Sequence, residues 1–257
     1  MKIEAYLERI NYHGSLSPTA RTLRELQVAH LLAVPFENLS IHAGEPVVLE
    51  DNALFAKIVE RRRGGFCYEA NGLFAALLRA LGFNVSMLSA EVARATGGFG
   101  PAFDHMALMV DLEKRWLVDV GFGDSFLEPL LLDERSVQVQ GDGRAFRIDA
   151  DGPFLVLMQR DGAGDWEPEY RFTLTPHEFI DYAGMCRFHQ TSPQSHFTRG
   201  RICSRATADG RITLSEMRFI RTSVKEGRQE STLTSEQEYA AVLREHFGIV
   251  MEGRRRD

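Results

Sequence analysis

Apolar residues recur at helical spacing through the first third of the chain. The clearest stripe consists of Phe66, Ala70, Leu73, Phe74, Leu77, Leu78 and Leu81. Spacings of three, four and seven residues predict an amphipathic helix, and Gly82 follows it where helices commonly end in a left-handed residue. Two earlier stripes predict a helix that starts at Ser17-Pro18 and ends before Pro35, and another capped by Asp51. Residues 1–82 are therefore predicted to be mainly helical.

The pattern changes after residue 82. Segments up to about residue 156 are short, β-rich and interrupted by glycine, and residues 105–111 and 116–120 flank a charged turn typical of a β-hairpin. Strands are also expected at residues 145–148 and 154–159, which predicts a curled antiparallel sheet or barrel. The last third mixes elements. We expect a short helix opening at residues 175–178, a polar loop-like stretch at 186–198, strands within 201–220 and a helix over 235–247.

Composition removes several classes of function. The 257 residues carry a net charge of −6, which argues against a general surface for nucleic acid or anionic membrane. The chain shows no signal-peptide-like start and no apolar run of membrane-spanning length. Its three cysteines are too few and too scattered for a disulfide framework or a cysteine-rich zinc site. We therefore expect a reduced, cytoplasmic protein without a bound metal.

Cys67 is the candidate nucleophile. It stands in the first turn of the predicted helix, directly after Gly64-Gly65-Phe66. Unpaired backbone N–H groups and the positive end of the helix dipole are expected to lower the pKa of its thiol. The glycine pair would let backbone or ligand come close to the sulfur. The alternative is a buried structural cysteine, which is how we interpret Cys186 and Cys203.

A nucleophilic cysteine needs a base, and the base needs a group that orients it. The predicted hairpin offers both, because His105 starts its first strand and Asp119 lies near the end of its second. Alternation places the two side chains on one face if the loop has an odd number of residues. The open alternatives are a core histidine, a strand-end aspartate, and pairing of the thiol with another of the eight histidines.

Five blocks of sequence together resemble the arylamine N-acetyltransferase family. In chain order they are Pro35-Phe36-Glu37-Asn38-Leu39, the run from Arg63 to Gly72 with Cys67 at its centre, His105-Met106, Val118-Asp119-Val120-Gly121-Phe122-Gly123, and the block from His189 to Thr198 with Ile202-Cys203-Ser204. The resemblance extends over nearly the whole chain. It implies an α+β fold with a helical N-terminal bundle (1–82), a central antiparallel β-barrel (83–185) and a C-terminal α/β lid (186–257), with a cysteine-protease-like core.

The resemblance also implies a reaction and a site. Family chemistry is ping-pong transfer of acetyl from acetyl-CoA to an arylamine, an arylhydrazine or an N-hydroxyarylamine. By motif position, Cys67, His105 and Asp119 form the catalytic triad. Three aromatic residues are expected at the acceptor pocket: Phe122, Phe103 and Phe197. The loop that contains Gly98 and Gly100 resembles the region approached by CoA, and the expected assembly is a monomer or a homodimer.

Three other functional interpretations of the sequence remain open. One is a transglutaminase-like or papain-like thiol amidase, and a closer one is an amide synthase that uses the same triad. The third is a binding protein that kept the fold without its chemistry. Separately, Glu37 and Arg63 both sit in apolar motif contexts, which suggests a structural ion pair behind the active site.

Overall fold

The computed structural model describes residues 1–251. Its helices are α1 Ile3–Arg9, α2 Ala20–Ala33, α3 Leu39–Ala43, α4 Asp51–Phe55 continued by the π-helical turn η1 Ala56–Glu60, α5 Cys67–Ala80, the 3₁₀ turn η2 Phe179–Tyr182, α6 Ala183–Thr191, α7 His196–Arg199, and α8 Glu236–Val242 continued by η3 Leu243–Phe247. Its strands are β1 Phe36–Glu37, β2 Asn84–Val92, β3 His105–Asp111, β4 Arg115–Val118, β5 Leu130–Leu131, β6 Gln138–Val139, β7 Ala145–Asp151, β8 Phe154–Arg160, β9 Glu167–His177, β10 Ile202–Thr207, β11 Gly210–Ser215, β12 Arg218–Ser223 and β13 Gly227–Thr232.

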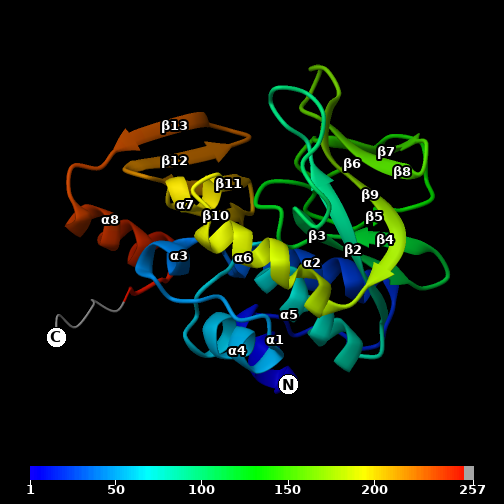
Figure 1. Ribbon diagram of the computed structural model, residues 1–257, viewed down its shortest axis with the longest axis horizontal. Coiled ribbons are helices and arrows are strands. Elements are labelled where there is room, and N and C mark those ends of the chain that lie inside the picture. The colour runs from blue at the N-terminus through cyan, green and yellow to red at the C-terminus, as the bar shows by residue number, and fades with distance from the viewer. Residues whose placement is uncertain (252–257) are drawn as a thin grey trace.

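Two antiparallel sheets lie side by side above the N-terminal helices, and α6 crosses the middle of the molecule (Figure 1). The larger sheet has eight strands in the order β5-β4-β3-β2-β9-β8-β7-β6, and the smaller has five in the order β1-β10-β11-β12-β13. The α+β prediction is confirmed. Within residues 1–251, none of the helices combines the length and the apolar character that a membrane span requires.

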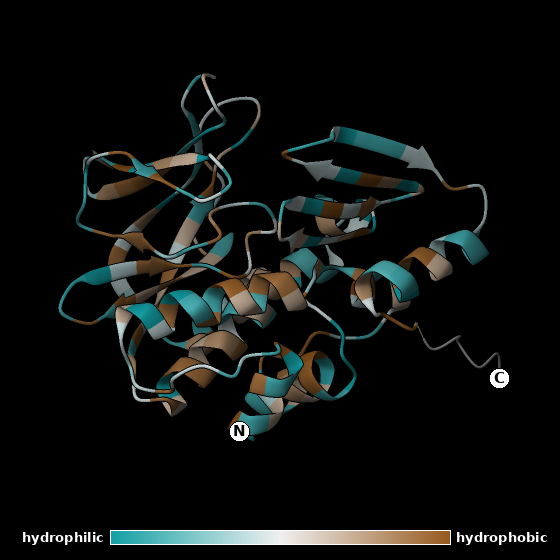
Figure 2. Cartoon of the chain, turned by 180° about the vertical axis from the view of Figure 1, so that it is seen from behind, coloured by the Kyte–Doolittle hydropathy of each residue, from teal (hydrophilic) through white to brown (hydrophobic). Residues whose placement is uncertain are grey.

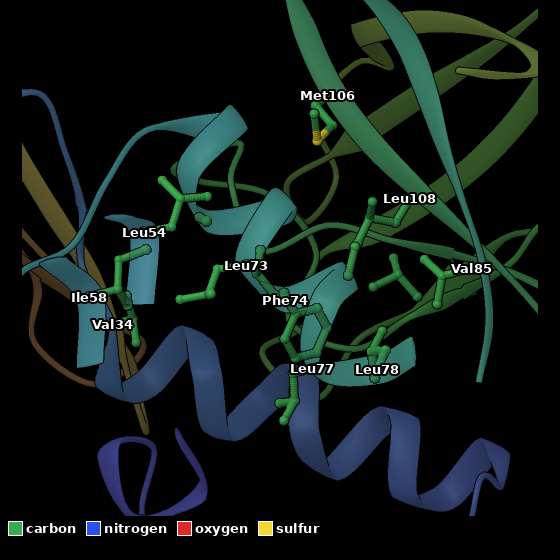
Figure 3. Packing of buried hydrophobic residues seen from close by; sticks show 14 of the residues in the cluster. Val34, Leu54, Ile58, Leu73, Phe74, Leu77, Leu78, Val85, Met106 and Leu108 are labelled. Atoms are coloured by element: carbon green, nitrogen blue, oxygen red, sulfur yellow. The ribbon is translucent and has the colours of Figure 1, made fainter. Parts of the chain in front are cut away.

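The helix α5 lies at the centre of the largest apolar core. Leu73, Phe74 and Leu77 are completely buried, and they face residues of α4, η1 and the first barrel strands in Figure 3. Gly82 has a φ of +89°, so the helix ends where the sequence predicted it. This packing matters for function because it fixes the position and direction of the N-terminus of α5.

The eight-stranded sheet curls until its two edges meet. No backbone ladder joins β5 to β6 in the described chain. Instead, the side-chain amide of Gln138 on β6 accepts a hydrogen bond from the backbone N–H of Leu131 on β5 (2.8 Å) and donates one to its carbonyl (3.0 Å). One glutamine side chain thus replaces a pair of ladder hydrogen bonds and brings the sheet close to a barrel.

The five-stranded sheet joins distant parts of the chain. Its first strand, β1, comes from the N-terminal third and pairs with β10, with Glu37 opposite Cys203. Its last strand, β13, is exposed along its whole length and almost entirely hydrophilic (Figure 2). Charged side chains such as Arg228 and Glu230 on that edge oppose pairing with another chain. The three-part division at residues 82 and 185 stays a prediction.

Three predicted boundaries were wrong. Thr19, not Ser17, caps α2, because its hydroxyl accepts a hydrogen bond from the N–H of Thr22 (3.2 Å). Asp51 is the first residue of α4 and not its cap. The strand β9 also runs through residues 175–177, and the 3₁₀ turn begins only at Phe179.

The stretch 186–198 was predicted to be loop-like but is mostly helical, in α6 and α7. Its polar residues misled the pattern because several of them find partners inside the protein. The side-chain oxygen of Gln190 accepts a hydrogen bond from the N–H of Val47 (2.7 Å), and a ring nitrogen of His189 lies 3.0 Å from the hydroxyl oxygen of Ser195. Buried polar groups that find partners do not show in hydropathy periodicity.

The predicted ion pair between Glu37 and Arg63 is confirmed. Glu37 is fully buried, Arg63 is 4% exposed, and Nη2 of Arg63 lies 2.8 Å from Oε1 of Glu37. Lys57 belongs to the same cluster, since its Nζ is 3.8 Å from Oε1 of Glu37 and 2.7 Å from Oε1 of Glu69. The four charges balance, and the cluster lies directly behind the residues that lead into Cys67.

Replacing Glu37 by Gln should therefore destabilise the fold. The change leaves the charge of the buried Arg63 with only a 3.9 Å contact to the half-exposed carboxylate of Glu45. Breaking a buried pair from one side typically costs about 3–5 kcal/mol. Urea denaturation followed by circular dichroism would measure the loss in free energy of unfolding.

The matched control is Glu128→Gln, because Glu128 pairs with Arg24 at 2.6 Å on the surface, where the arginine side chain is 61% exposed. Exposed pairs contribute about 1 kcal/mol or less. A Glu37→Gln protein as stable as this control would show that the buried cluster is not needed.

Candidate active site

Cys67 is the first residue of α5, as its sequence context indicated. Phe66 precedes the helix with extended backbone, and its N–H donates to the Glu69 carboxylate (3.2 Å), which closes the first turn from the outside. Gly64, two residues before Phe66, is needed because it packs against the backbone of Pro35. A Cβ on Gly64 would lie 1.9 Å from the carbonyl oxygen of Pro35, so only glycine lets the two chain segments touch.

His105 and Asp119 come together as the hairpin predicted. Strand β3 pairs with β4 so that Leu108 is opposite Val118, and the loop of residues 112–114 is odd in number. Continuing this register puts Asp119 opposite Ala107, on the same face as His105 and two residues from it. The carboxylate oxygen Oδ2 of Asp119 accepts a hydrogen bond from Nε2 of His105 at 2.7 Å, with both residues at most 3% exposed.

Asp119 is the most heavily hydrogen-bonded carboxylate of the site. Its Oδ1 accepts from the side-chain amide of Asn71 (2.9 Å) and from the N–H of Gly121 (2.8 Å). Its Oδ2 accepts from His105 and from the hydroxyl of Tyr170 (3.2 Å). Four donors compensate the charge that burial would otherwise penalise, and they hold the carboxylate in one orientation.

Asn71 and Gly121 connect this pair to the helix of Cys67, and neither had been assigned a role from the sequence. The Asn71 side chain, one turn along α5 from Cys67, also donates to the carbonyl of Met106 (2.6 Å) and accepts from the N–H of Val120 (2.9 Å). Both residues lie within the motifs noted above, but no spacing rule links an amide on a helix to a turn 50 residues later. Only their contacts reveal the connection.

The thiol of Cys67 differs electrostatically from the expectation. Burial raises its pKa well above the usual value, although the backbone N–H of Met106 donates a hydrogen bond that lowers it. The nearby carboxylates of Asp119 and Asp104 raise it further. The helix N-terminus alone was therefore an incomplete guide, because it ignored how completely the sulfur is withdrawn from water.

Of the three aromatic residues expected at the acceptor pocket, Phe122 touches the candidate base. Its ring lies edge-to-face with the His105 imidazole at 5.1 Å between centroids. Phe103 packs on Tyr182 (5.2 Å) and Phe197 on Phe66 (5.5 Å), so both belong to the aromatic packing around the start of α5. Their roles toward a substrate stay predictions.

Gly98 and Gly100 lie on the connection between β2 and β3. Gly98 is exposed with a φ of +74°, and Gly100 is half-buried beside the carboxylate of Asp104. Their proposed contact with a cosubstrate stays a prediction. Among the 251 described residues, no group of three or more His, Cys, Asp and Glu side chains is arranged to hold a metal ion.

A Gly121→Ala change should disrupt the junction between Cys67 and Asp119. A Cβ there would lie 2.7 Å from Cα and 2.9 Å from the carbonyl oxygen of Cys67, and backbone atoms cannot rotate away. Moving the Asp119 segment by about 1 Å is expected to slow alkylation of Cys67 by iodoacetamide about 100-fold. Gly141→Ala is the control, because a Cβ at Gly141 meets nothing within 4 Å. Equal alkylation rates for the two variants would contradict the close contact.

The carboxyl group of Glu169, whose pKa is influenced by the charge of Asp119, is expected to make the stability of the fold depend on pH. Glu169 accepts a hydrogen bond from the hydroxyl of Ser125. Burial raises the pKa of Glu169 from 4.5 to about 8, the Ser125 hydrogen bond opposes the shift, and the charge of Asp119 adds to it. Between these values the folded protein keeps a proton that the unfolded chain has lost. The free energy of unfolding should therefore fall as pH rises through this window.

Replacing Glu169 by Gln removes this titration. Urea denaturation between about pH 5 and pH 8 should show the parent losing stability relative to Glu169→Gln, by roughly 1.4 kcal/mol per pH unit at most. Parallel curves for the two proteins would mean that Glu169 is ionised in the folded state throughout the window.

The geometry agrees with the comparisons to known proteins. A family model described as N-acetyltransferase matches residues 19–256. The arylamine N-acetyltransferase of Mycolicibacterium smegmatis is 40% identical over 221 residues, which cover 83% of this chain and 80% of that protein. Proansamycin X synthase of Amycolatopsis mediterranei is 32% identical, with 94% of this chain and 95% of that protein covered.

Solved structures show the same fold. The arylamine N-acetyltransferase of Mycobacterium marinum in complex with CoA is 34% identical and superposes with a TM-score of 0.89, over 96% of this chain and 93% of that one. The match of the family model and the identity over most of each sequence lead to one assignment. The chain is a member of the arylamine N-acetyltransferase family.

Proposed function

We propose that this protein transfers an acetyl group from acetyl-CoA to the nitrogen of an arylamine or arylhydrazine, or to the oxygen of an N-hydroxyarylamine, through an acetyl-cysteine intermediate at Cys67. The observation that carries the proposal is the His105–Asp119 pair, held by hydrogen bonds to the same helix that begins with Cys67. In this proposal Cys67 is the nucleophile, His105 the base and Asp119 the orienting group. The cosubstrate assignment is supported by a family relative whose structure was solved with CoA.

The first step forms the thiolate. Because burial and two carboxylates raise the pKa of the Cys67 thiol, the sulfur needs a cation close by to lose its proton. Nε2 of His105 is committed to Asp119, which leaves Nδ1 as the ring nitrogen that can take the proton from sulfur. Transfer of that proton leaves a thiolate beside an imidazolium.

Acetyl transfer follows in two steps. The thiolate attacks the thioester carbonyl, the bond from the acetyl carbon to the CoA sulfur breaks, and CoA leaves with the proton that His105 had received. In this proposal, backbone N–H groups at the start of α5 stabilise the oxyanion. The amine nitrogen then attacks the acetyl-cysteine, neutral His105 takes its proton, and the Cys67 thiolate departs.

The aromatic residues beside the base support an aromatic acceptor. Phe122 contacts both His105 (5.1 Å) and Tyr170 (5.2 Å), so a planar ring stacked there would bring its amine toward the imidazole. Aromatic amines are weakly basic and stay unprotonated at neutral pH, which is the form that attacks an acyl carbon. An amine with a high pKa would reach the same site mainly as a cation.

A synthase is the second candidate, because one relative over nearly the full chain is named as a synthase and not as an acetyltransferase. The triad geometry would serve either reaction, since both pass an acyl group through the cysteine. The two differ in the donor: free acetyl-CoA in one, a larger acyl chain in the other. The donor is therefore the quantity to test.

Intact-protein mass spectrometry after mixing with acetyl-CoA, with no amine present, should show a gain of roughly 42 Da, one acetyl group. The adduct should be absent from Cys67→Ala and should disappear when an aromatic amine such as aniline is added. His105→Gln should still bind CoA but form the adduct at least about 100-fold more slowly.

Failure to form the adduct in a protein whose Cys67 is readily alkylated would exclude acetyl-CoA as donor and favour the synthase. An adduct that persists in the presence of aromatic amines and hydrazines would contradict the acceptor assignment. An adduct of the same mass on Cys67→Ala would place the acetyl group on another residue.

A further inference from the structure

A second aspartate–histidine pair lies next to the first, as a close polar contact and not as an aligned hydrogen bond. Nε2 of His189, on α6, lies 3.1 Å from Oδ1 of Asp104, the residue immediately before His105. The other ring nitrogen of His189 is 3.0 Å from the hydroxyl oxygen of Ser195. His189 and Ser195 are each 2% exposed, whereas the Asp104 side chain is 18% exposed.

The same pair touches the residue that follows the nucleophile. The His189 ring lies nearly parallel to the ring of Tyr68, at 28° with 6.1 Å between centroids. The hydroxyl of Tyr68 in turn donates to the backbone carbonyl of Phe103 (2.6 Å) and to that of Asp104 (3.3 Å). The contacts form a closed ring, from the helix of Cys67 through Tyr68 to the start of β3, and back through Asp104 and His189.

Although serine, histidine and aspartate stand in line here, the arrangement is not a second catalytic centre. The hydroxyl oxygen of Ser195 accepts the N–H of Phe197 (3.2 Å) and so caps the short helix α7. Ser195 therefore orients its neighbours, because its hydroxyl already interacts with the N–H of Phe197 and with the His189 ring.

We propose that His189 and Asp104 are positioning residues, which hold the backbone before His105 at a fixed distance from the helix of Cys67. This proposal rests on the triad proposed above. His105 can place its imidazole against the sulfur only if the peptide on its N-terminal side is held. That peptide belongs to a connection with Phe103 at a positive φ of 65°, a conformation that non-glycine residues seldom keep without outside support. The Tyr68 hydroxyl, on α5, donates hydrogen bonds to the backbone carbonyls of this connection. His189, on α6, contacts the Asp104 side chain.

The role predicts effects on Cys67 reactivity that a purely structural contact would not cause. His189→Ala and Asp104→Ala should each slow alkylation of Cys67 by iodoacetamide, and lower kcat for acetyl transfer, by about 10- to 100-fold. KM for the aromatic amine should change by no more than about twofold, because the acceptor wall is untouched. His189→Gln, which keeps a donor toward Asp104, should recover most of the parental alkylation rate.

The double variant Asp104→Ala/His189→Ala should react no more slowly than the slower single variant, since both changes break one contact. The control is His30→Ala. His30 is completely buried and has a ring nitrogen 2.8 Å from the Tyr6 hydroxyl, so its loss removes a histidine of similar burial from the helical core. It should lower stability while Cys67 keeps its alkylation rate.

A parental alkylation rate in His189→Ala, or effects of the two alanine variants that multiply in the double variant, would overturn the proposal. If His189→Ala does not fold, Asp104→Ala is compared with Asp104→Asn, because both remove the carboxylate that raises the pKa of the Cys67 thiol and only alanine loses the contact with His189. Equal alkylation rates for these two variants would then overturn the proposal. The proposed triad fails separately: in that case His105→Ala would leave the alkylation rate of Cys67 in the parent background unchanged.

Discussion

The buried carboxylate of Asp119 sets the constraint on which the site depends. An ionised group that is 3% exposed is tolerated only if its oxygens are hydrogen-bonded, and Asp119 receives donors from His105, Asn71, Tyr170 and Gly121. These donors come from two barrel strands, a turn and α5. Satisfying one charge therefore locks the helical part of the molecule against the barrel, at the point where the nucleophile begins its helix.

On its other side, the start of α5 is held by a cluster of buried ion pairs. Glu37, Lys57, Arg63 and Glu69 form a buried cluster in which two carboxylates face two cations. Buried ion pairs contribute little net stability compared with apolar packing, but they allow only one arrangement of the segments that carry them. Here those segments are β1, the π-helical turn η1, the glycine pair and the first turn of α5. The position of Cys67 is thus determined from both sides by polar contacts within an apolar core.

In the proposed mechanism the sulfur of Cys67 is withdrawn from water and still reacts. Burial raises the pKa of Cys67, and a single thiol in such a place would stay protonated. The His105 imidazole, with one nitrogen bound to Asp119, offers the proton acceptor that burial demands. In the proposed reaction the same burial would keep water from the acyl intermediate, since Cys67 and His105 are at most 3% exposed. In this proposal the reactivity of Cys67 therefore depends on the His105–Asp119 pair and not on the helix terminus alone.

The sequence by itself determined the helix that begins at Cys67, its end at Gly82, the β3–β4 hairpin, and the shared face of His105 and Asp119. Each of these follows from a local rule: the 3.6-residue period, a left-handed cap, and alternation across an odd loop. The motif blocks added the family, and the apolar context of two charges predicted the Glu37–Arg63 pair. The tertiary structure alone decided which polar groups meet across distant segments. Examples are Asn71 with Asp119, His189 with Asp104, and Gln138 closing the barrel edge on Leu131. Such contacts have no period and no fixed spacing, because a buried polar side chain is placed by whichever partner the folded chain brings within reach. For that reason the helical segment 186–198 was mistaken for a loop, and the pKa of Cys67 was expected to shift in the wrong direction.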